Sequence, residues 1–370
     1  MARLLALDLV VMVLVLSVGT ATAVADDPIS GELAGIAKQV QTALTTAGKS
    51  TVAVGDFAGP AQIDTNYGPG LALGLSRALQ ERGVVVDRKA EFSLRGRYAA
   101  VPSDRYAGQT MVRLTTELFD RDDEPKGAFQ ARFYDNPSIA RILGVNVKLS
   151  PGADSRTRNL EVVEAVERPS ATIQGTLVRS SPQSPFAVEV FVAPGPGRPF
   201  AARTPALVEG HPFVDIQRGE TYQLRIHNGA PFEAAVMVSI DGLNVFQFCE
   251  VKTPQGRPAY FFFPISARTS FDVVGWFRTM QRSDSFLVTA YGQGAGSLLR
   301  DPPSGKRGVI SVGFTACAPA REQLPADEHV EGRGAEGNET GLGPPRGAQF
   351  TQVHRVLGVM RDMVSIRYSH

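Results

Sequence analysis

The chain has 370 residues, of which 43% are apolar and 20% charged, and its 38 Lys and Arg residues nearly balance its 37 Asp and Glu residues. This composition excludes a disordered chain, and a formal net charge of +1 gives no basic excess for binding nucleic acid. A chain of this length predicts about two domains.

The N-terminal segment has the pattern of an export signal. Arg3 precedes an apolar run at residues 9–16, and small residues that suit a signal peptidase follow it up to Ala25. We expect residues 1–25 to be a signal peptide, so that the mature protein is periplasmic or extracellular. An uncleaved segment would instead anchor the protein to the membrane. No other segment is long and apolar enough to span a bilayer.

Residues 26–150 alternate between helical and strand patterns. Apolar residues from 29 to 44 recur at steps of three and four, which predicts a helix, and residues 51–57 are typical of a buried strand. A second helix is predicted at 71–79, ending before Gly83. Further elements are predicted at 84–86, 92–98, 111–119, 138–143 and 145–149. This alternation predicts a small α/β domain.

Residues 151–170 are polar, and we expect them to be a linker. From residue 171 the helical period disappears. Strands are predicted at 171–178, 186–193, 213–217, 221–227, 233–241, 243–248, 258–263, 270–277, 283–291, 308–316 and 363–369. Two dipeptides, Asn228-Gly229 and Asp241-Gly242, suit tight hairpins because both residues tolerate positive φ.

The predicted fold class is therefore α+β multidomain: a small α/β domain followed by an antiparallel β-sandwich of jelly-roll or immunoglobulin-like type over residues 171–370. The stretch at 318–349 is rich in Pro, Gly and Glu, which predicts a mobile loop before the last strand. Asn338 begins a glycosylation sequon within this loop.

Two glycine motifs resemble nucleotide-binding loops. Residues 43–50 match the relaxed phosphate-loop pattern, but a helix enters the motif and a strand leaves it, which is the reverse of the required order. The glycines at 68, 70 and 74 miss the spacing of a dinucleotide fingerprint. We interpret the first motif as a helix C-cap and the second as close backbone packing, and we expect no cofactor.

Catalytic and metal-binding patterns are weak. The five histidines (His211, His227, His329, His354 and His370) lack metal-ligand spacing, and no nucleophile elbow occurs. Asp56, Glu233, Asp241 and Asp272 could face a cleft, although carboxylates at strand ends are usually solvated. Cys249 and Cys317 are the only cysteines, and an oxidising compartment permits one disulfide between them.

The aromatic residues allow two interpretations. Trp276, the only tryptophan, and the run at 260–263 lie in predicted strands, where aromatic side chains usually belong to the core. They could also form a carbohydrate-binding platform, and a concave aromatic face would distinguish that case.

Residues 52–57, the helix at 70–83, and the strands at 92–98 and 112–114 together resemble a bacterial envelope domain. This domain is found in flagellar-assembly outer-membrane lipoproteins, in curli-secretion proteins and at the amino terminus of the Tol-system propeller protein. The resemblance covers about 100 residues of the 370. It implies an α/β fold and non-catalytic assembly or binding work at the envelope. The lipobox cysteine of the lipoprotein members is missing.

A second stretch looks like an uncharacterised β-domain of exported bacterial proteins. Its motif residues are Asp241, Gly242, Gly275 and Trp276. The resemblance implies a fold in which these residues are structural, and it implies no catalytic site.

These observations predict an exported, non-enzymatic envelope protein that acts as a binding or assembly adaptor. Its partner would be an envelope protein or a surface polymer, and neither nucleic acid nor an integral membrane span is expected. The alternative is a small-ligand or carbohydrate-binding jelly-roll protein. A hydrolase with an unrecognised site is the third hypothesis, and it would require convergent carboxylates or a hidden triad.

Overall fold

The computed structural model describes residues 12–14, 28–59, 69–103, 110–133, 136–253, 256, 258–279, 282–290, 293–299, 308–328, 350–352 and 355–369. Strands make up 46% of the protein, which is therefore mostly β, with both mixed and antiparallel sheets. Among the described residues, no helix combines the length and apolar character needed to cross a membrane.

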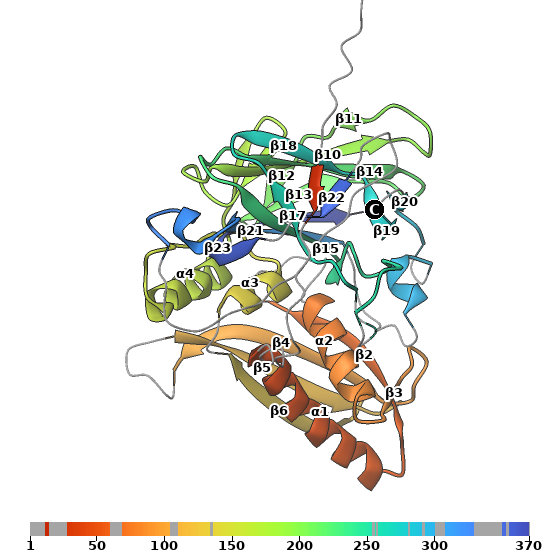
Figure 1. Ribbon diagram of the computed structural model, residues 1–370. Helices are drawn as coiled ribbons and strands as arrows, with labels where there is room; N and C mark the ends of the chain where they lie inside the picture. The colour runs from red at the N-terminus through yellow and green to blue at the C-terminus, as the bar shows by residue number, and fades with distance from the viewer. Residues whose placement is uncertain are drawn as a thin grey trace, which may run out of the picture.

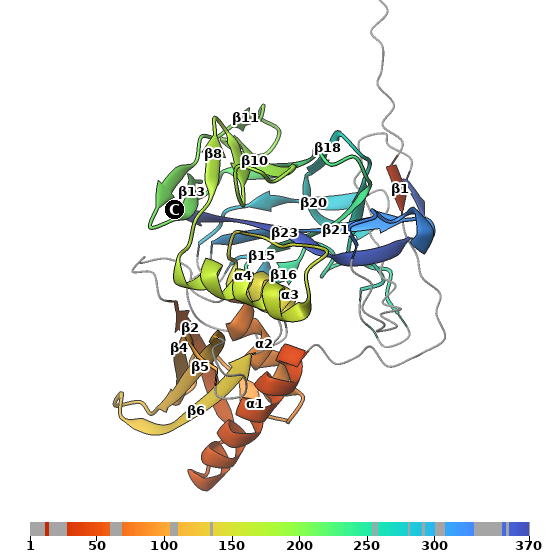
Figure 2. The ribbon, with the colours of Figure 1, turned by 90° about the vertical axis from the view of Figure 1, so that its left-hand side faces the viewer.

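The first half of the chain builds a five-stranded sheet with the order β3-β2-β4-β5-β6. Its strands are β2 (Thr51–Ala58), β3 (Val85–Val86), β4 (Ser93–Pro102), β5 (Thr110–Phe119) and β6 (Pro125–Phe133). Strand β2 is parallel to both of its neighbours, β3 and β4. The pairs β4–β5 and β5–β6 are antiparallel. Helices α1 (Pro28–Thr46) and α2 (Pro69–Gln80) cover one face of this sheet (Figure 2).

Helix α1 forms where the sequence predicts it. Ile36, Val40 and Leu44 are almost completely buried along one side of the helix, because residues three and four apart share a helix face. The helix ends at Thr46, and Gly48, with a φ of 68°, turns the chain so that Lys49 N–H donates to the carbonyl of Leu44.

The expected linker at 151–170 is instead helix α4 (Ser155–Glu167). Asp154 caps it by accepting a hydrogen bond from the backbone N–H of Thr157 at 2.7 Å. Val162 and Val166 are buried in the core of the first half, so this segment is part of the packed protein. It precedes the β-rich half without acting as a spacer.

Two eight-stranded sheets follow and enclose a second core. The first has the order β19-β20-β14-β10-β9-β8, with β11 beside β10 and β18 beside β14. Its strands are β8 (Thr172–Gln174), β9 (Leu177–Arg179), β10 (Phe186–Ala193), β11 (Ala201–Ala202), β14 (Thr221–Asn228), β18 (Thr269–Val273), β19 (Gly275–Thr279) and β20 (Arg282–Leu287).

The second of these sheets has the order β12-β13-β23-β21-β15-β16, with β17 beside β15 and β7 beside β23. Its strands are β7 (Val147–Lys148), β12 (Ala206–Val208), β13 (His211–Asp215), β15 (Ala234–Ile240), β16 (Leu243–Asn244), β17 (Phe263–Ile265), β21 (Val309–Ala318) and β23 (Val356–Ser369). The last strand is inserted between β13, which is parallel to it, and β21, which is antiparallel.

One of the two predicted hairpin turns forms. Asp241 and Gly242 have φ angles of 53° and 80° and connect β15 to β16. The prediction of a hairpin at Asn228-Gly229 is wrong, because the strands on either side of it, β14 and β15, belong to different sheets. The Asn228 side chain instead donates to the carbonyls of Phe232 and Ile265, which fixes the crossing between the sheets.

Helix α3 (Asn136–Leu143) and α4 lie between the five-stranded sheet and the two larger sheets (Figure 1). The predicted strand at 145–149 is only β7, and it pairs with β23 in the second half. Met237 and Met363 from that half join the core of the first. The two halves therefore pack as one continuous body.

Two further segments complete the described structure. The expected mobile loop is fixed in its first part, because Arg361 forms ion pairs with Asp327 and Glu328. A short helix, η2 (Arg321–Gln323), lies just before these two acidic residues, and another, η1 (Ala295–Leu298), follows β20. Strands β1 (Met12–Leu14) and β22 (Phe350–Gln352) pair in parallel.

Candidate functional site

The second face of the five-stranded sheet carries no helix among the described elements. Polar side chains alternate onto it, together with Ala99, Phe119 and Ala128. In β4, Leu94 and Tyr98 are buried beneath the helices, whereas Arg95 and Arg97 alternate with them and are exposed. The same alternation exposes Arg113 on β5 and Arg132 on β6. All four arginines therefore extend from the uncovered face.

Strand register brings these arginines together. Arg113 lies directly opposite Arg132 on the neighbouring strand. Arg97 lies opposite Thr115, two residues from Arg113, and is therefore its diagonal neighbour. Arg95 stands two residues from Arg97 on β4. We call Arg95, Arg97, Arg113 and Arg132 the arginine track.

The track is most strongly cationic at its centre. Arg95 is opposite Glu117, forms an ion pair with Asp123 and lies 4.7 Å above the ring of Phe119. Within the described part of the chain, neither Arg97 nor Arg113 forms an ion pair. Like charges placed directly opposite on a sheet are unfavourable, and Arg113 and Arg132 form such a pair.

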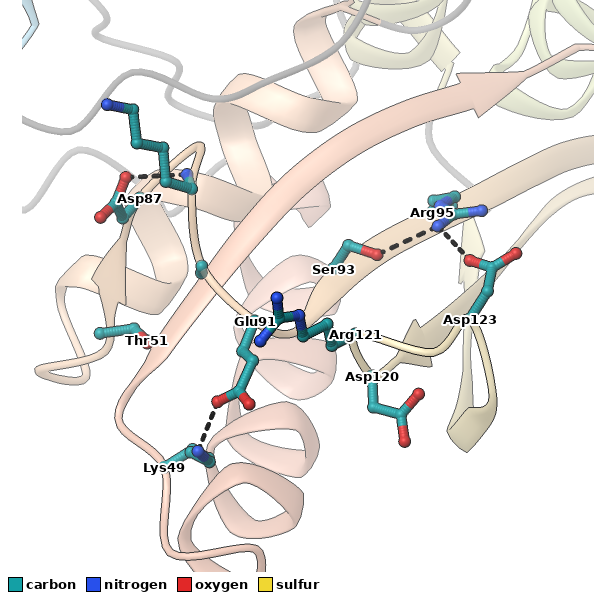
Figure 3. A pocket seen from close by; sticks show the side chains of 11 residues that line it. Lys49, Thr51, Asp87, Glu91, Ser93, Arg95, Asp120, Arg121 and Asp123 are labelled. Atoms are coloured by element: carbon teal, nitrogen blue, oxygen red, sulfur yellow. Dashed lines mark hydrogen bonds and ion pairs between the residues drawn. The ribbon is translucent and has the colours of Figure 1, made fainter.

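A polar pocket of about 710 Å³ adjoins the Arg95 end of the track (Figure 3). Four acidic and four basic side chains line it: Asp87, Glu91, Asp120 and Asp123, with Lys49, Lys89, Arg95 and Arg121. Figure 3 shows Lys49 paired with Glu91, and Arg95 paired with both Ser93 and Asp123.

The pocket's carboxyl groups suit ion pairing better than acid catalysis. A hydrogen bond from Lys49 lowers the pKa of Glu91, and Lys126 together with the backbone of Glu124 lowers the pKa of Asp120. A general acid working near neutral pH needs the opposite shift. The pocket is therefore better suited to holding charged groups than to donating protons.

The two glycine motifs have the structural roles predicted for them. Gly48 turns the chain after α1, and Lys49 pairs with Glu91. A Cβ on Gly70 would lie 2.7 Å from the carbonyl oxygen of Ile142, and one on Gly74 would lie 2.8 Å from Leu33. These glycines allow α2 to pack closely against its neighbours.

The two cysteines are free in the structure, and no disulfide joins them. Cys249 is buried in the core between the larger sheets. The thiol of Cys317 lies 3.3 Å from a carboxylate oxygen of Glu233, and burial and this carboxylate both raise the pKa of the thiol. Each sulfur has its own surroundings, so the disulfide permitted by the cysteine count is not formed.

Three of the four motif residues quoted for the second resemblance make close contacts inside the β-rich half. Asp241 accepts hydrogen bonds from the backbone of Gly308 and Val309 and from the hydroxyl of Tyr368. A Cβ on Gly275 would lie only 2.1 Å from a carbonyl oxygen of Asp284. The Trp276 ring is edge-on to the rings of Phe248 and Phe286.

Most aromatic residues that could have formed a platform are packed inside the protein. Phe261 and Phe262 are partly buried against the core of the first half. Phe246, Phe263 and Phe277 are completely buried, and Trp276 packs against the same cluster. They therefore do not build the exposed aromatic face that a carbohydrate platform requires.

The carboxylates proposed from the sequence are not brought together. Glu233 pairs with Arg355 and Asp272 with Arg225, while Asp241 binds backbone amides. Asp56 lies on β2 in the first half of the chain. Glu233, Asp241 and Asp272 have separate local partners and Asp56 lies in the other half, so the four carboxylates are not gathered at one site.

Of the histidines, His211 is buried, and burial together with Arg367 lowers its pKa to about 3. His227 lies 2.7 Å from Glu189 on the outer face of its sheet. Ser270 stands opposite His227 in the register, but the two side chains form no hydrogen bond. The described residues contain no group of three or more potential metal ligands.

Several predicted features lie outside the described residues: His329, His354, His370, the sequon at Asn338, and all of the expected signal peptide except β1.

One buried carboxyl group escaped the sequence analysis. Asp362 on β23 is completely buried, and the hydroxyl of Ser184 donates to its Oδ2 at 2.7 Å. Within the described structure, its Oδ1 has no hydrogen-bond partner. Burial raises the pKa of Asp362 to about 7, and the hydrogen bond from the Ser184 hydroxyl limits the rise. The sequence does hold a signal for this buried group, because Asp362 continues the alternate positions Val364, Ile366 and Tyr368 of the last strand.

Comparison with known protein families, characterised proteins and solved structures finds no match to this chain.

Proposed function

We propose that this protein is an exported, non-enzymatic component of the cell envelope that acts as a binding or assembly adaptor. In this proposal a small α/β unit presents the binding surface, and a β-sandwich of jelly-roll or immunoglobulin-like type supports it. The partner is an anionic envelope component that docks on the arginine track.

The uncovered, arginine-bearing face carries the proposal. Three guanidinium groups, from Arg97, Arg113 and Arg132, gather on adjacent strands, although the whole chain has a formal net charge of only +1. Concentrated charge of one sign steers and orients an oppositely charged partner. A rigid sheet keeps the groups in place before binding, which reduces the entropy lost on association.

Photocrosslinking in cells tests this function. A photoreactive amino acid replaces Thr115, at the centre of the track, and a second protein carries it at Gln217, an exposed position of the β-rich half. We expect reproducible crosslinks to an envelope component from position 115 alone. The double variant R97E/R113E should abolish them.

The matched control is R198E/R218E, which makes the same charge change at two exposed arginines outside the track. It should leave the crosslinks intact. Equal crosslinking from positions 115 and 217, or crosslinks that survive R97E/R113E, would contradict the proposal. Thermal unfolding of each variant confirms that it is folded.

A further inference from the structure

We propose that the arginine track binds a linear, phosphate-bearing polymer, an assignment that rests on the binding function proposed above. The observation behind it is the path that the four guanidinium groups follow across the sheet. The four arginines occupy neighbouring positions of one sheet face, two of them on β4, one on β5 and one on β6.

The steps of this path are short and similar. Arg95 and Arg97 are alternate residues of one strand, so their Cα atoms are about 6.7 Å apart. Arg97 and Arg113 are diagonal neighbours whose backbone positions are about 7–8 Å apart. Arg113 and Arg132 face each other, with their Cβ atoms about 5 Å apart. A flexible chain with an anionic group in every repeat can place successive groups along such a path. Carboxylates fixed on a folded protein surface would need a matching diagonal of their own.

The side-chain chemistry favours phosphate. A guanidinium group binds phosphate through two parallel N–H donors, and arginine is preferred where this planar geometry matters. Thr115 and Gln130 lie in the row that begins with Arg97 and supply neutral hydrogen-bonding groups beside the cations. Such groups suit the uncharged oxygens that connect phosphates in a polymer.

The same face disfavours single-stranded nucleic acid. Proteins that bind single strands stack the bases on exposed aromatic rings. On the described uncovered face of β4, β5 and β6 the aromatic ring is Phe119, and the Arg95 guanidinium already lies over it. The track therefore offers charge for a phosphate backbone without a stacking surface for bases.

Calorimetric titration of the folded protein with inorganic polyphosphate tests the inference, with polyglutamate and oligothymidylate as comparison polymers. We expect polyphosphate to bind most tightly. The logarithm of its association constant should fall with the logarithm of salt concentration with a slope of about −3, because each neutralised charge on a single-stranded polyanion contributes about −0.7.

The double variant R97Q/R113Q should reduce that slope by about 1.4, since it removes two of the four contacts. The control R198Q/R218Q has the same change in net charge and should keep the full slope. An equal loss in the control, tighter binding of polyglutamate or oligothymidylate, or absence of polyphosphate binding would overturn the phosphate-polymer assignment.

The crosslinking experiment separates this failure from failure of the proposed function. If polyphosphate does not bind but crosslinks from position 115 to an acidic envelope protein disappear in R97E/R113E, the adaptor function stands and the polymer assignment is wrong. If neither crosslinking nor polyphosphate binding depends on the arginine track, the adaptor function and the polymer assignment are both wrong.

Discussion

The carboxyl group of Asp362 links protonation to folding. It is buried on β23, where desolvation raises its pKa from 3.8 to about 7. Because the folded protein holds this proton more tightly than the unfolded chain, the stabilising effect is complete below about pH 4. It is then lost as the pH rises through about 7. Above that pH the folded state must bury a charge.

Asp362→Asn should remove this dependence, because asparagine resembles the protonated carboxyl group in shape and stays neutral. At pH 8 we expect the variant to be more stable than the wild type by up to about 4 kcal/mol, since each pKa unit corresponds to about 1.4 kcal/mol. At pH 4 the two proteins should be similar. Urea unfolding at both pH values measures the difference.

The exposed residue Asp122 provides the control. Asp122→Asn should leave the difference between pH 4 and pH 8 unchanged. If Asp362→Asn kept the wild-type change in the free energy of unfolding between pH 4 and pH 8, the buried carboxyl group would not be the source of that change.

At the scale of strands and helices, much of the pattern was predictable. Strand β10 matches its predicted range, because uninterrupted apolar and aromatic residues between turns are typical of a buried strand. Helix α4 was missed because charged residues surround its short apolar stripe of Val162, Val163 and Val166. Its N-cap, Asp154, was the better signal. The Asn228-Gly229 dipeptide predicted a hairpin, but longer-range pairing decided otherwise.

The candidate site could be predicted only in part. Alternation within a strand indicates that Arg95 and Arg97 share a face. Sequence alone does not give the register that places Arg113 opposite Arg132, and a shift by one residue would turn one of them to the covered face. The arginine track therefore required the pairing of β4, β5 and β6.

Replacing one member of the opposed pair should stabilise the protein. Arg113→Thr removes the repulsion from Arg132 and adds a β-branched residue, so we expect a gain of about 0.2–1 kcal/mol in the free energy of unfolding at low salt. The gain should shrink at high salt because exposed charges are screened. Denaturant unfolding at two salt concentrations measures both effects.

Arg97→Thr is the matched control, because Arg97 faces Thr115 rather than another arginine. Its effect should be smaller and less dependent on salt. If Arg113→Thr destabilised the protein at low salt, repulsion between Arg113 and Arg132 would not be lowering the free energy of unfolding.

At the scale of the whole molecule, buried polar contacts join the two halves. The Asn146 side chain donates to the carbonyl of Ser365 at 3.1 Å and accepts from its N–H at 2.8 Å. Arg367, which is 1% exposed, donates to the carbonyl of Gly144 at 3.0 Å. Together with the shared core, these contacts should make the halves unfold together.

Asn146→Ala should lower the free energy of unfolding by about 2–4 kcal/mol, because it leaves a buried donor and a buried acceptor of Ser365 without partners. All four described α-helices lie in the first half and Trp276 lies in the second. Helical circular dichroism and tryptophan fluorescence should therefore show coincident transitions in both the wild type and the variant.

Gln39→Ala is the control, since this exposed amide bonds only within its own helix. It should change stability little. Separate midpoints for the two probes in the wild type would contradict the single cooperative unit.

Strand β23 also sets the order of events during synthesis. Residues 356–369 leave the ribosome after every other strand of their sheet, yet they occupy its middle, between β13 and β21. Until then both neighbours expose unpaired backbone edges, and β7 has no strand to join. The sheet therefore cannot be completed, and the second core cannot close, before residues 356–369 are available to pair with β13 and β21.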